Sequence, residues 1–204
     1  MTKHDTPKAF SDQLDGWVKG NQLKNLQTLI DLFEDKSFAV VMLLLMLIPA
    51  LPIPTGGVTH VFEVVVALLA LEQIAGLKAI WLPRSLTKKV KLEKIMKGKL
   101  VVAMMNRVRW LEKRSSPRWT GFFKLPLVER AIGLVVLGLT VTAFLSPPFS
   151  GLDTLPSLGV VIVSLAVILE DVVMLLAGIV VGALGVVLSV GFGAVVVKAV
   201  QSLF

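Results

Sequence analysis

The sequence predicts an all-α integral membrane protein built from two repeated helical hairpins. The chain of 204 residues is 55% hydrophobic, and only 17% of its residues are charged, against about 25% in a typical soluble domain. Its mean hydropathy of +0.81 is too high for a soluble protein of this size to cover its apolar surface. Long uncharged segments are interrupted by short proline- and glycine-rich stretches, and this pattern occurs twice in the same order.

The first hairpin is expected over residues 37–76, around the proline- and glycine-rich stretch at residues 49–57. Its first arm, residues 38–51, carries no charge and would be about 20 Å long as a helix. This is short for a hydrocarbon core about 30 Å thick. Three prolines within six residues end the helix there. Both a re-entrant and a fully spanning hairpin fit this length, and so do ordinary hairpins whose turns lie in water.

The second hairpin is expected over residues 125–171. Pro147-Pro148-Phe149-Ser150-Gly151 matches residues 52–56 in its leading proline and its closing hydroxyl–glycine pair. Repeated apolar segments broken by proline and glycine favour a transporter-like site near the middle of the membrane. The two copies can be parallel or inverted, although the basic middle offers no convincing crossing of the kind that inversion requires.

The candidate substrate-binding residues gather at the two turns. The start of a helix offers unpaired N–H groups and positive partial charge, and glycine lets a ligand approach the backbone. Two such ends brought together would suit an anionic headgroup or a carboxylate. The candidates are Pro52, Pro54, Thr55, Gly56, Thr59, His60 and Glu63 in the first hairpin, and Pro147, Pro148, Ser150, Gly151 and Asp153 in the second.

Acidic residues in or beside the apolar arms are candidates for proton or ion coupling: Glu63, Glu72, Glu170 and Asp171. A carboxylate inside a membrane is costly, which makes it a functional hypothesis by default. His60 lies three residues before Glu63 and shares its helix face. The alternatives are that Glu63 only complements a helix dipole and that Asp153 only caps a helix. With no cysteine and scattered acids, we expect no metal and no cofactor.

The first 36 residues form an amphipathic N-terminal segment, with an apolar stripe at helical spacing. Interfacial helices lying on the membrane and a soluble cap packing on the protein's own loops both fit this pattern. No signal peptide is expected, because acids and bases are mixed and no apolar run precedes residue 38. The stripe consists of Phe10, Leu14, Trp17, Leu23, Leu26, Ile30 and Phe33.

The middle segment, residues 77–124, is strongly basic. Residues 78–124 have a net charge of +12 from fourteen basic and two acidic residues. The positive-inside rule therefore places this segment on the cytoplasmic face of the membrane. In so apolar a chain, the expected partners of these charges are anionic lipid headgroups and not nucleic acid. Trp81, Trp119, Phe122 and Phe123 are expected to lie at the membrane interface.

The C-terminal region, residues 172–204, predicts a membrane-spanning helix. Residues 172–197 carry no charge and are long enough to cross a bilayer. Gly178, Gly182 and Gly185 have the small-residue spacing that permits close helix packing. A homodimer seam at these glycines fits this spacing, and so does the ordinary abundance of glycine in membrane helices. The five segments together form one membrane domain.

The order of these elements resembles the ExoD family of bacterial exopolysaccharide-synthesis membrane proteins, over nearly everything after about Leu29. Glu72 departs from the glutamine expected at its position and puts in doubt any role for an uncharged amide there. The resemblance implies a multi-pass protein of the bacterial inner membrane linked to exopolysaccharide production, but it supplies no reaction. It is carried by Pro52-Ile53-Pro54, Thr59, Trp81-Leu82-Pro83-Arg84, Leu155-Pro156 and Leu169-Glu170-Asp171.

Three classes of function are compatible with these features. A transporter-like protein would use the two turns around one polar site, and we favour it. A non-catalytic factor would bind lipid or act as a scaffold for polysaccharide-synthesis proteins. An enzyme would have only His60 and Glu63 as a local acid/base pair, and the sequence has no phosphate loop or zinc signature. We therefore expect no enzymatic activity.

Overall fold

The computed structural model describes residues 10–19, 26–33, 36–52, 58–81, 99–115, 119–147 and 150–201. The regular structure in these ranges is helical, without a β-strand, which confirms the expected all-α class. The helices are α1 (Phe10–Lys19), α2 (Leu26–Phe33), α3 (Ser37–Met46), α4 (Val58–Ile74), α7 (Lys99–Arg114), α8 (Thr120–Phe123), α9 (Pro126–Leu145), α10 (Thr154–Leu169) and α11 (Val172–Gln201).

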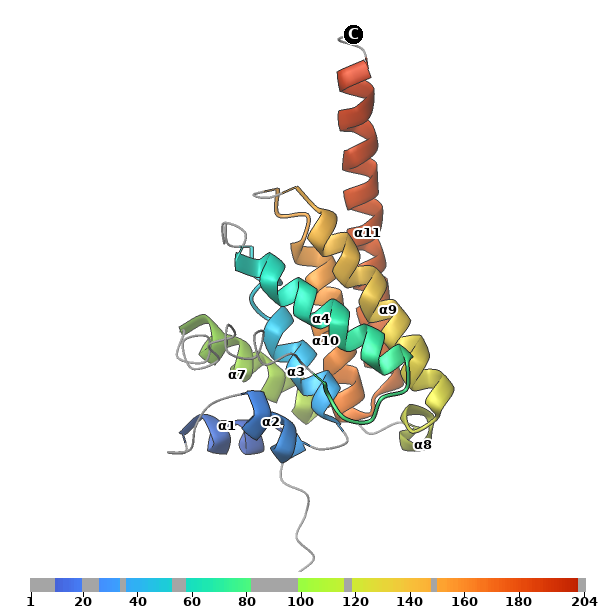
Figure 1. Cartoon of the computed structure of the whole chain (residues 1–204). Coiled ribbons are helices and arrows are strands. Elements are labelled where there is room, and N and C mark those ends of the chain that lie inside the picture. Colours follow the sequence, from blue (N-terminus) through green and yellow to red (C-terminus); the bar gives the residue numbers. More distant parts are fainter. Residues whose placement is uncertain are drawn as a thin grey trace, which may run out of the picture.

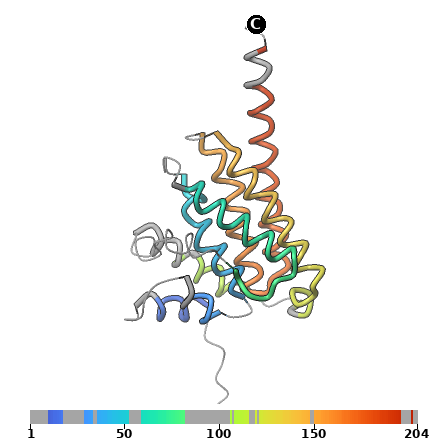
Figure 2. The backbone as a smooth tube through the Cα atoms, in the orientation of Figure 1, coloured from blue at the N-terminus to red at the C-terminus, as the bar shows by residue number. Residues whose placement is uncertain are grey.

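The core consists of two helical hairpins, α3–α4 and α9–α10, whose turns lie at the same end of the molecule (Figure 1). Helix α4 packs along α9, and α3 packs along α10, so each arm contacts the opposite arm of the other hairpin, and α11 packs most extensively against α10. The backbone trace in Figure 2 follows both first arms in the same direction. The two hairpins are therefore parallel copies, because the segment between them starts and ends at one end of the bundle.

Helices α1, α2, α7 and α8 lie at the other end of the bundle, here called the polar end (Figure 1). Helix α1 is fastened to α7, because the Glu112 carboxylate accepts hydrogen bonds from the backbone N–H groups of Phe10 (2.6 Å) and Ser11 (3.3 Å). Asp15 and Arg109 form an ion pair between the same two helices.

The apolar stripe of α1 faces protein. Phe10, Leu14 and Trp17 are all buried, and Leu29 of α2 is buried as well. For α1, this burial favours the packing cap over interfacial contact with lipid. The stripe packs against other helices of the chain, and the Phe10 ring lies 5.2 Å from that of Phe33 in α2, measured between centroids. Two of the aromatic residues expected at the membrane interface differ in exposure, because Trp119 is exposed whereas Phe123 is buried.

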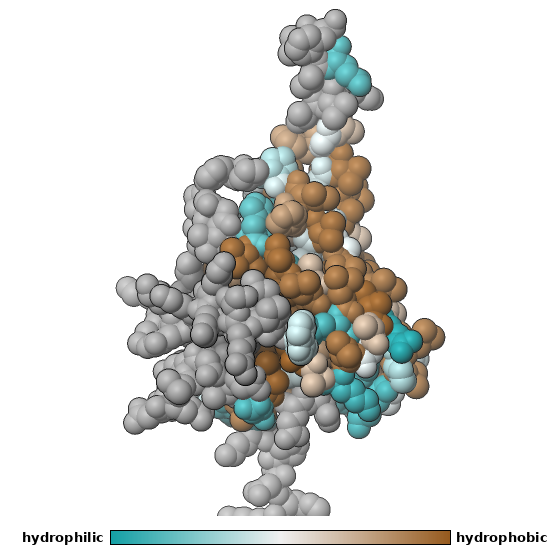
Figure 3. Space-filling view, in the orientation of Figure 1, coloured by the Kyte–Doolittle hydropathy of each residue, from teal (hydrophilic) through white to brown (hydrophobic). Residues whose placement is uncertain are grey.

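Helices α9 and α11 are long and apolar enough to cross a membrane, judged by length and composition. Figure 3 shows apolar side chains over the exposed sides of α4, α9 and α11. Helix α11 projects beyond the hairpin turns, and Val190 and Val195 in this projecting part are each 65% exposed. Soluble monomers rarely expose so large a continuous apolar surface.

The glycines of α11 form a seam within the chain. A Cβ added to Gly178 would lie 2.8 Å from the backbone nitrogen of Val163, and one on Gly185 would lie 2.6 Å from that of Pro156. A Cβ added to Gly182 would lie 2.5 Å from the side chain of Leu139. The expected homodimer seam at these glycines is therefore wrong, because α10 and α9 of the same chain already occupy it.

Candidate functional site

The centre of the candidate site is Glu63, one and a half turns into α4. Its side chain has 0% exposure. One carboxylate oxygen, Oε2, lies 2.7 Å from Nδ1 of His60, as expected for residues three apart on one helix face. The other oxygen, Oε1, is buried and has no hydrogen-bond partner in the described part of the chain. Because an unpaired buried charge is costly, this pair is suited to holding one shared proton.

Groups from the second hairpin surround this pair. The His60 ring contacts Phe144 of α9 edge to face, with 5.2 Å between the ring centroids. The Asp153 carboxylate, just before α10, is close enough to Glu63 to act on it electrostatically. Asp153 makes no side-chain capping hydrogen bond, so the expected capping role is not observed. The beginning of α4, the end of α9 and the beginning of α10 therefore meet around one carboxylate.

Buried hydroxyl groups continue the polar interior. Thr140 of α9 lies seven residues after Gly133, which packs against Ala70 and Ile74 of α4, so both residues share the α4-facing side. The hydroxyl oxygens of Thr140, Ser157 and Ser164 are buried without a hydrogen-bond partner among the described residues. Buried polar groups in proteins normally have partners, so these hydroxyls mark an interior suited to polar guests.

Some of the other predicted substrate-binding residues lie in the described part of the chain and some do not. Pro54, Thr55, Gly56 and Pro148 lie outside the described residues, whereas Pro52 and Pro147 are exposed at the turns. Thr59 is buried beside the His60–Glu63 pair in the first turn of α4. The predicted shared site at the two turns thus stays a prediction for the undescribed positions.

Ser150 and Gly151 shape the second turn. The Ser150 hydroxyl donates to the carbonyl of Pro147 (2.6 Å) and accepts from the N–H of Leu152 (3.2 Å). Gly151 has a φ of +70°, which only glycine adopts without strain. These two residues therefore hold the turn in shape.

The other acids proposed for ion coupling lie at the polar end, away from Glu63. Asp171 accepts hydrogen bonds from the N–H groups of Val173 (3.0 Å) and Met174 (3.4 Å) and from the hydroxyl of Ser115 (2.9 Å). It therefore caps the start of α11. Glu170, at a φ of 54°, pairs with Lys36 at 2.9 Å.

Glu72 also has a structural contact, in the last turn of α4 at the polar end. Its carboxylate accepts a hydrogen bond from the backbone N–H of Trp81 at 2.9 Å. Partial burial raises the pKa of the Glu72 carboxyl, and this hydrogen bond acts in the opposite direction. These contacts tie elements together at the polar end.

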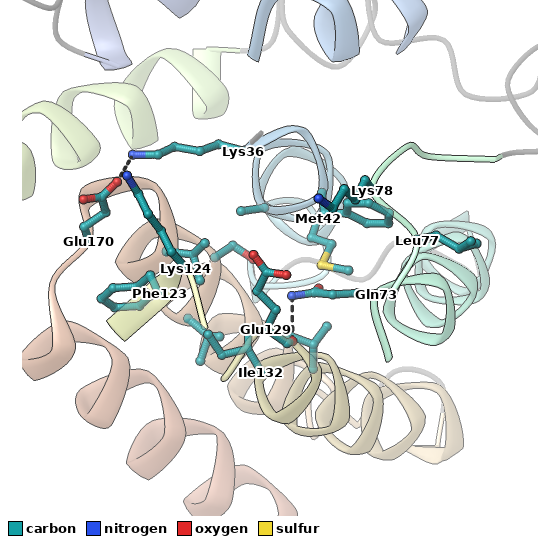
Figure 4. Close-up of a pocket in the computed structure, with 16 residues that line it drawn as sticks. Lys36, Met42, Gln73, Leu77, Lys78, Phe123, Lys124, Glu129, Ile132 and Glu170 are labelled. Atoms are coloured by element: carbon teal, nitrogen blue, oxygen red, sulfur yellow. Dashed lines mark hydrogen bonds and ion pairs between the residues drawn. The ribbon is translucent and has the colours of Figure 1, made fainter. Parts of the chain in front are cut away.

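A cavity of about 460 Å³ lies between the two hairpins at the polar end, and sequence reasoning missed it. Figure 4 shows charged and polar side chains around it, with Lys36, Lys124 and Glu170 on one side and Lys78 and Gln73 on the other. The sequence does place a polar residue at the end of each of the four hairpin arms, namely Lys36, Gln73, Glu129 and Glu170. In a parallel pair of hairpins, those four ends meet.

These features define a helical protein with a repeated hairpin core and two helices suited to crossing a membrane. The family model described as "Exopolysaccharide synthesis, ExoD" matches residues 10–191, and the chain belongs to this family. The resemblance seen in the sequence is confirmed, and family membership implies a role related to exopolysaccharide synthesis.

The chain is also similar to a protein of Synechocystis sp. (strain ATCC 27184 / PCC 6803 / Kazusa) that is described as uncharacterized. The two are 29% identical over 184 residues, which cover 88% of this chain and 80% of that protein. No solved structure matches the chain.

Proposed function

We propose that this protein acts in exopolysaccharide synthesis as a transporter-like protein of the bacterial inner membrane, coupled to protons through Glu63. One observation carries the proposal: a carboxylate with 0% exposure lies where both hairpins meet. Buried ionisable groups in membrane proteins are costly and typically mark proton or substrate pathways.

The chemistry follows from the arrangement of the charges. With one proton, Glu63 and His60 form either a neutral pair or an ion pair across 2.7 Å. Loss of that proton leaves a negative charge on the fully buried Glu63 carboxylate, and burial away from water disfavours this state. Protonation of Glu63 therefore favours entry of an anionic group at the neighbouring starts of α4 and α10, where the positive ends of two helix dipoles lie.

The position of the turns relative to α11 supports a re-entrant arrangement. The Ser189 hydroxyl donates to the carbonyl of Leu152 at 3.4 Å, which places the second turn level with Ser189. From Val172 to Ser189 a helix rises about 26 Å, and the uncharged run to Val197 rises about 38 Å. If a hydrocarbon core about 30 Å thick is centred on that run, the turn lies roughly 8 Å inside the far boundary.

The test is Glu63→Gln, which removes the titratable group with little change in side-chain volume. We expect a loss of proton flux in proteoliposomes carrying a pH-sensitive dye, and a loss of polysaccharide output in a strain lacking the chromosomal gene. The control is Asp12→Asn, which neutralises an exposed acid on α1. Wild-type flux and wild-type output in the Glu63→Gln variant would refute the proposal.

A second candidate function is a lipid-binding or scaffold factor of a polysaccharide-synthesis complex. The observation that favours it is the lysine-lined cavity at the polar end, within reach of lipid headgroups. Normal output in Glu63→Gln, together with polysaccharide-synthesis proteins that co-purify with this chain, would favour this function over transport.

A further inference from the structure

We propose that the cavity at the polar end binds a phosphorylated lipid, with the phosphate at Lys78 and Lys124 and one aliphatic chain between the two hairpins. The inference concerns a site separate from Glu63. It holds whether or not Glu63 carries protons.

The size and walls of the cavity fit one aliphatic chain. Its volume of about 460 Å³ lies in the range of about 300–1,000 Å³ that is usual for ligand pockets. Polar side chains form part of the wall, and apolar side chains from three helices form the rest, against which an aliphatic chain can pack away from water. The apolar side chains are Phe38, Ala39 and Met42 of α3, Ile132 and Val136 of α9, and Val163 and Val167 of α10.

The charges at the rim favour an anion. Lys36 donates to the carbonyl of Ile168 at 2.8 Å and pairs with Glu170 at 2.9 Å, so its charge is balanced within the protein. Lys78 and Lys124 come from different segments and flank the cavity on opposite sides (Figure 4). Both lysines line the same cavity, and their positive charge attracts a phosphate that enters it.

Glu129 makes the cavity selective for a particular kind of lipid headgroup. Its carboxylate points toward the cavity in Figure 4, and Gln73 donates a hydrogen bond to the Glu129 backbone carbonyl at 3.0 Å. A carboxylate is negatively charged, so it repels the phosphate itself. It can only accept hydrogen bonds, so it favours a ligand with a hydroxyl group next to the phosphate. The cavity is therefore suited to a phosphate ester that also carries a hydroxyl.

The location of the cavity agrees with a lipid that enters from one leaflet. It lies at the polar end, where the basic segment between the hairpins is anchored. Basic residues near a membrane surface attract anionic headgroups by about 1 kcal/mol each. From that surface, the walls of α3, α9 and α10 lead inward along the hairpins.

The test measures binding of lysophosphatidic acid, which has one acyl chain, a phosphate monoester and a hydroxyl. The purified full-length protein is titrated in neutral detergent, and binding is followed by native mass spectrometry and by thermal unfolding. Two probes separate the parts of the ligand. Monoacylglycerol has the chain without the phosphate, and glycerol 3-phosphate has the phosphate without the chain. We expect saturable binding of lysophosphatidic acid and at least tenfold weaker binding of each fragment.

Variants locate the binding to this cavity. The double variant Lys78→Ala/Lys124→Ala is expected to weaken binding at least tenfold, whereas Lys113→Ala, an exposed lysine on α7, leaves it unchanged. Val136→Phe is expected to exclude the acyl chain by filling the cavity.

Two outcomes would overturn the proposal. The first is equal binding of monoacylglycerol and lysophosphatidic acid, and the second is unchanged affinity in a lysine double variant that unfolds at the wild-type temperature. Failure of this test leaves the Glu63 proposal intact, because the two sites lie at opposite ends of the hairpins.

Discussion

The contact between α10 and α11 is so close that a single methyl group at Gly159 is expected to separate the helices. A Cβ added to Gly159 would lie 2.6 Å from Cα and 2.9 Å from the backbone nitrogen of Gly182, and 3.1 Å from the carbonyl oxygen of Gly178. All three atoms belong to the backbone of α11. They cannot move by a rotamer change, so the whole helix must shift.

The magnitude follows from two opposing effects. Overpacking of a tight interface costs about 1–3 kcal/mol, and contact with three backbone atoms places Gly159→Ala at the upper end of that range. Alanine in a helix interior is favoured over glycine by about 1 kcal/mol. The net loss in the free energy of unfolding is therefore about 2 kcal/mol. For a chain of this size, that loss lowers the melting temperature by roughly 4–8 °C.

The assay is thermal unfolding in detergent, followed by tryptophan fluorescence. The matched control is Gly191→Ala, also in a helix, where an added Cβ meets nothing within 4 Å. The control is expected to keep or raise the melting temperature, because only the helix preference changes. A Gly159→Ala variant as stable as Gly191→Ala would contradict the close contact between α10 and α11.

Three further predictions follow from the fold. A reporter fused near Ser115 should be cytoplasmic and one at the C-terminus periplasmic, since the two positions lie at opposite ends of the bundle; the same compartment for both would contradict this. Asp171→Ala should cost about 1 kcal/mol of stability through the lost cap, whereas Asp171→Asn should keep normal polysaccharide output; loss of output in the stable Asn variant would instead support ion coupling. Gly182→Leu should lower the folded yield of the chain by itself, measured by size exclusion, and a normal yield would exclude the intramolecular seam.

Several properties of this protein follow from the sequence by itself. Uncharged runs of helical length predict the arms, and prolines predict where they end, because proline lacks an N–H and blocks the preceding turn. The repeated order of turn and acid predicts two hairpins. The order of the motifs also identified the ExoD family, which the family model confirms.

Other properties were decided only by the tertiary structure. The sequence marked Glu63, Glu72, Glu170 and Asp171 as equal candidates for ion coupling, yet only Glu63 has 0% exposure with an oxygen left unpaired in the described part of the chain. Helical spacing tells which residues share a face, but not which helix covers that face. For the same reason, the sequence could not tell whether the stripe of α1 faces a membrane or the protein, nor which helix packs on the glycines of α11, and neighbouring helices of the same chain cover both. The cavity between the hairpins was missed because it exists only where four separate arm ends meet, and no local pattern records that meeting.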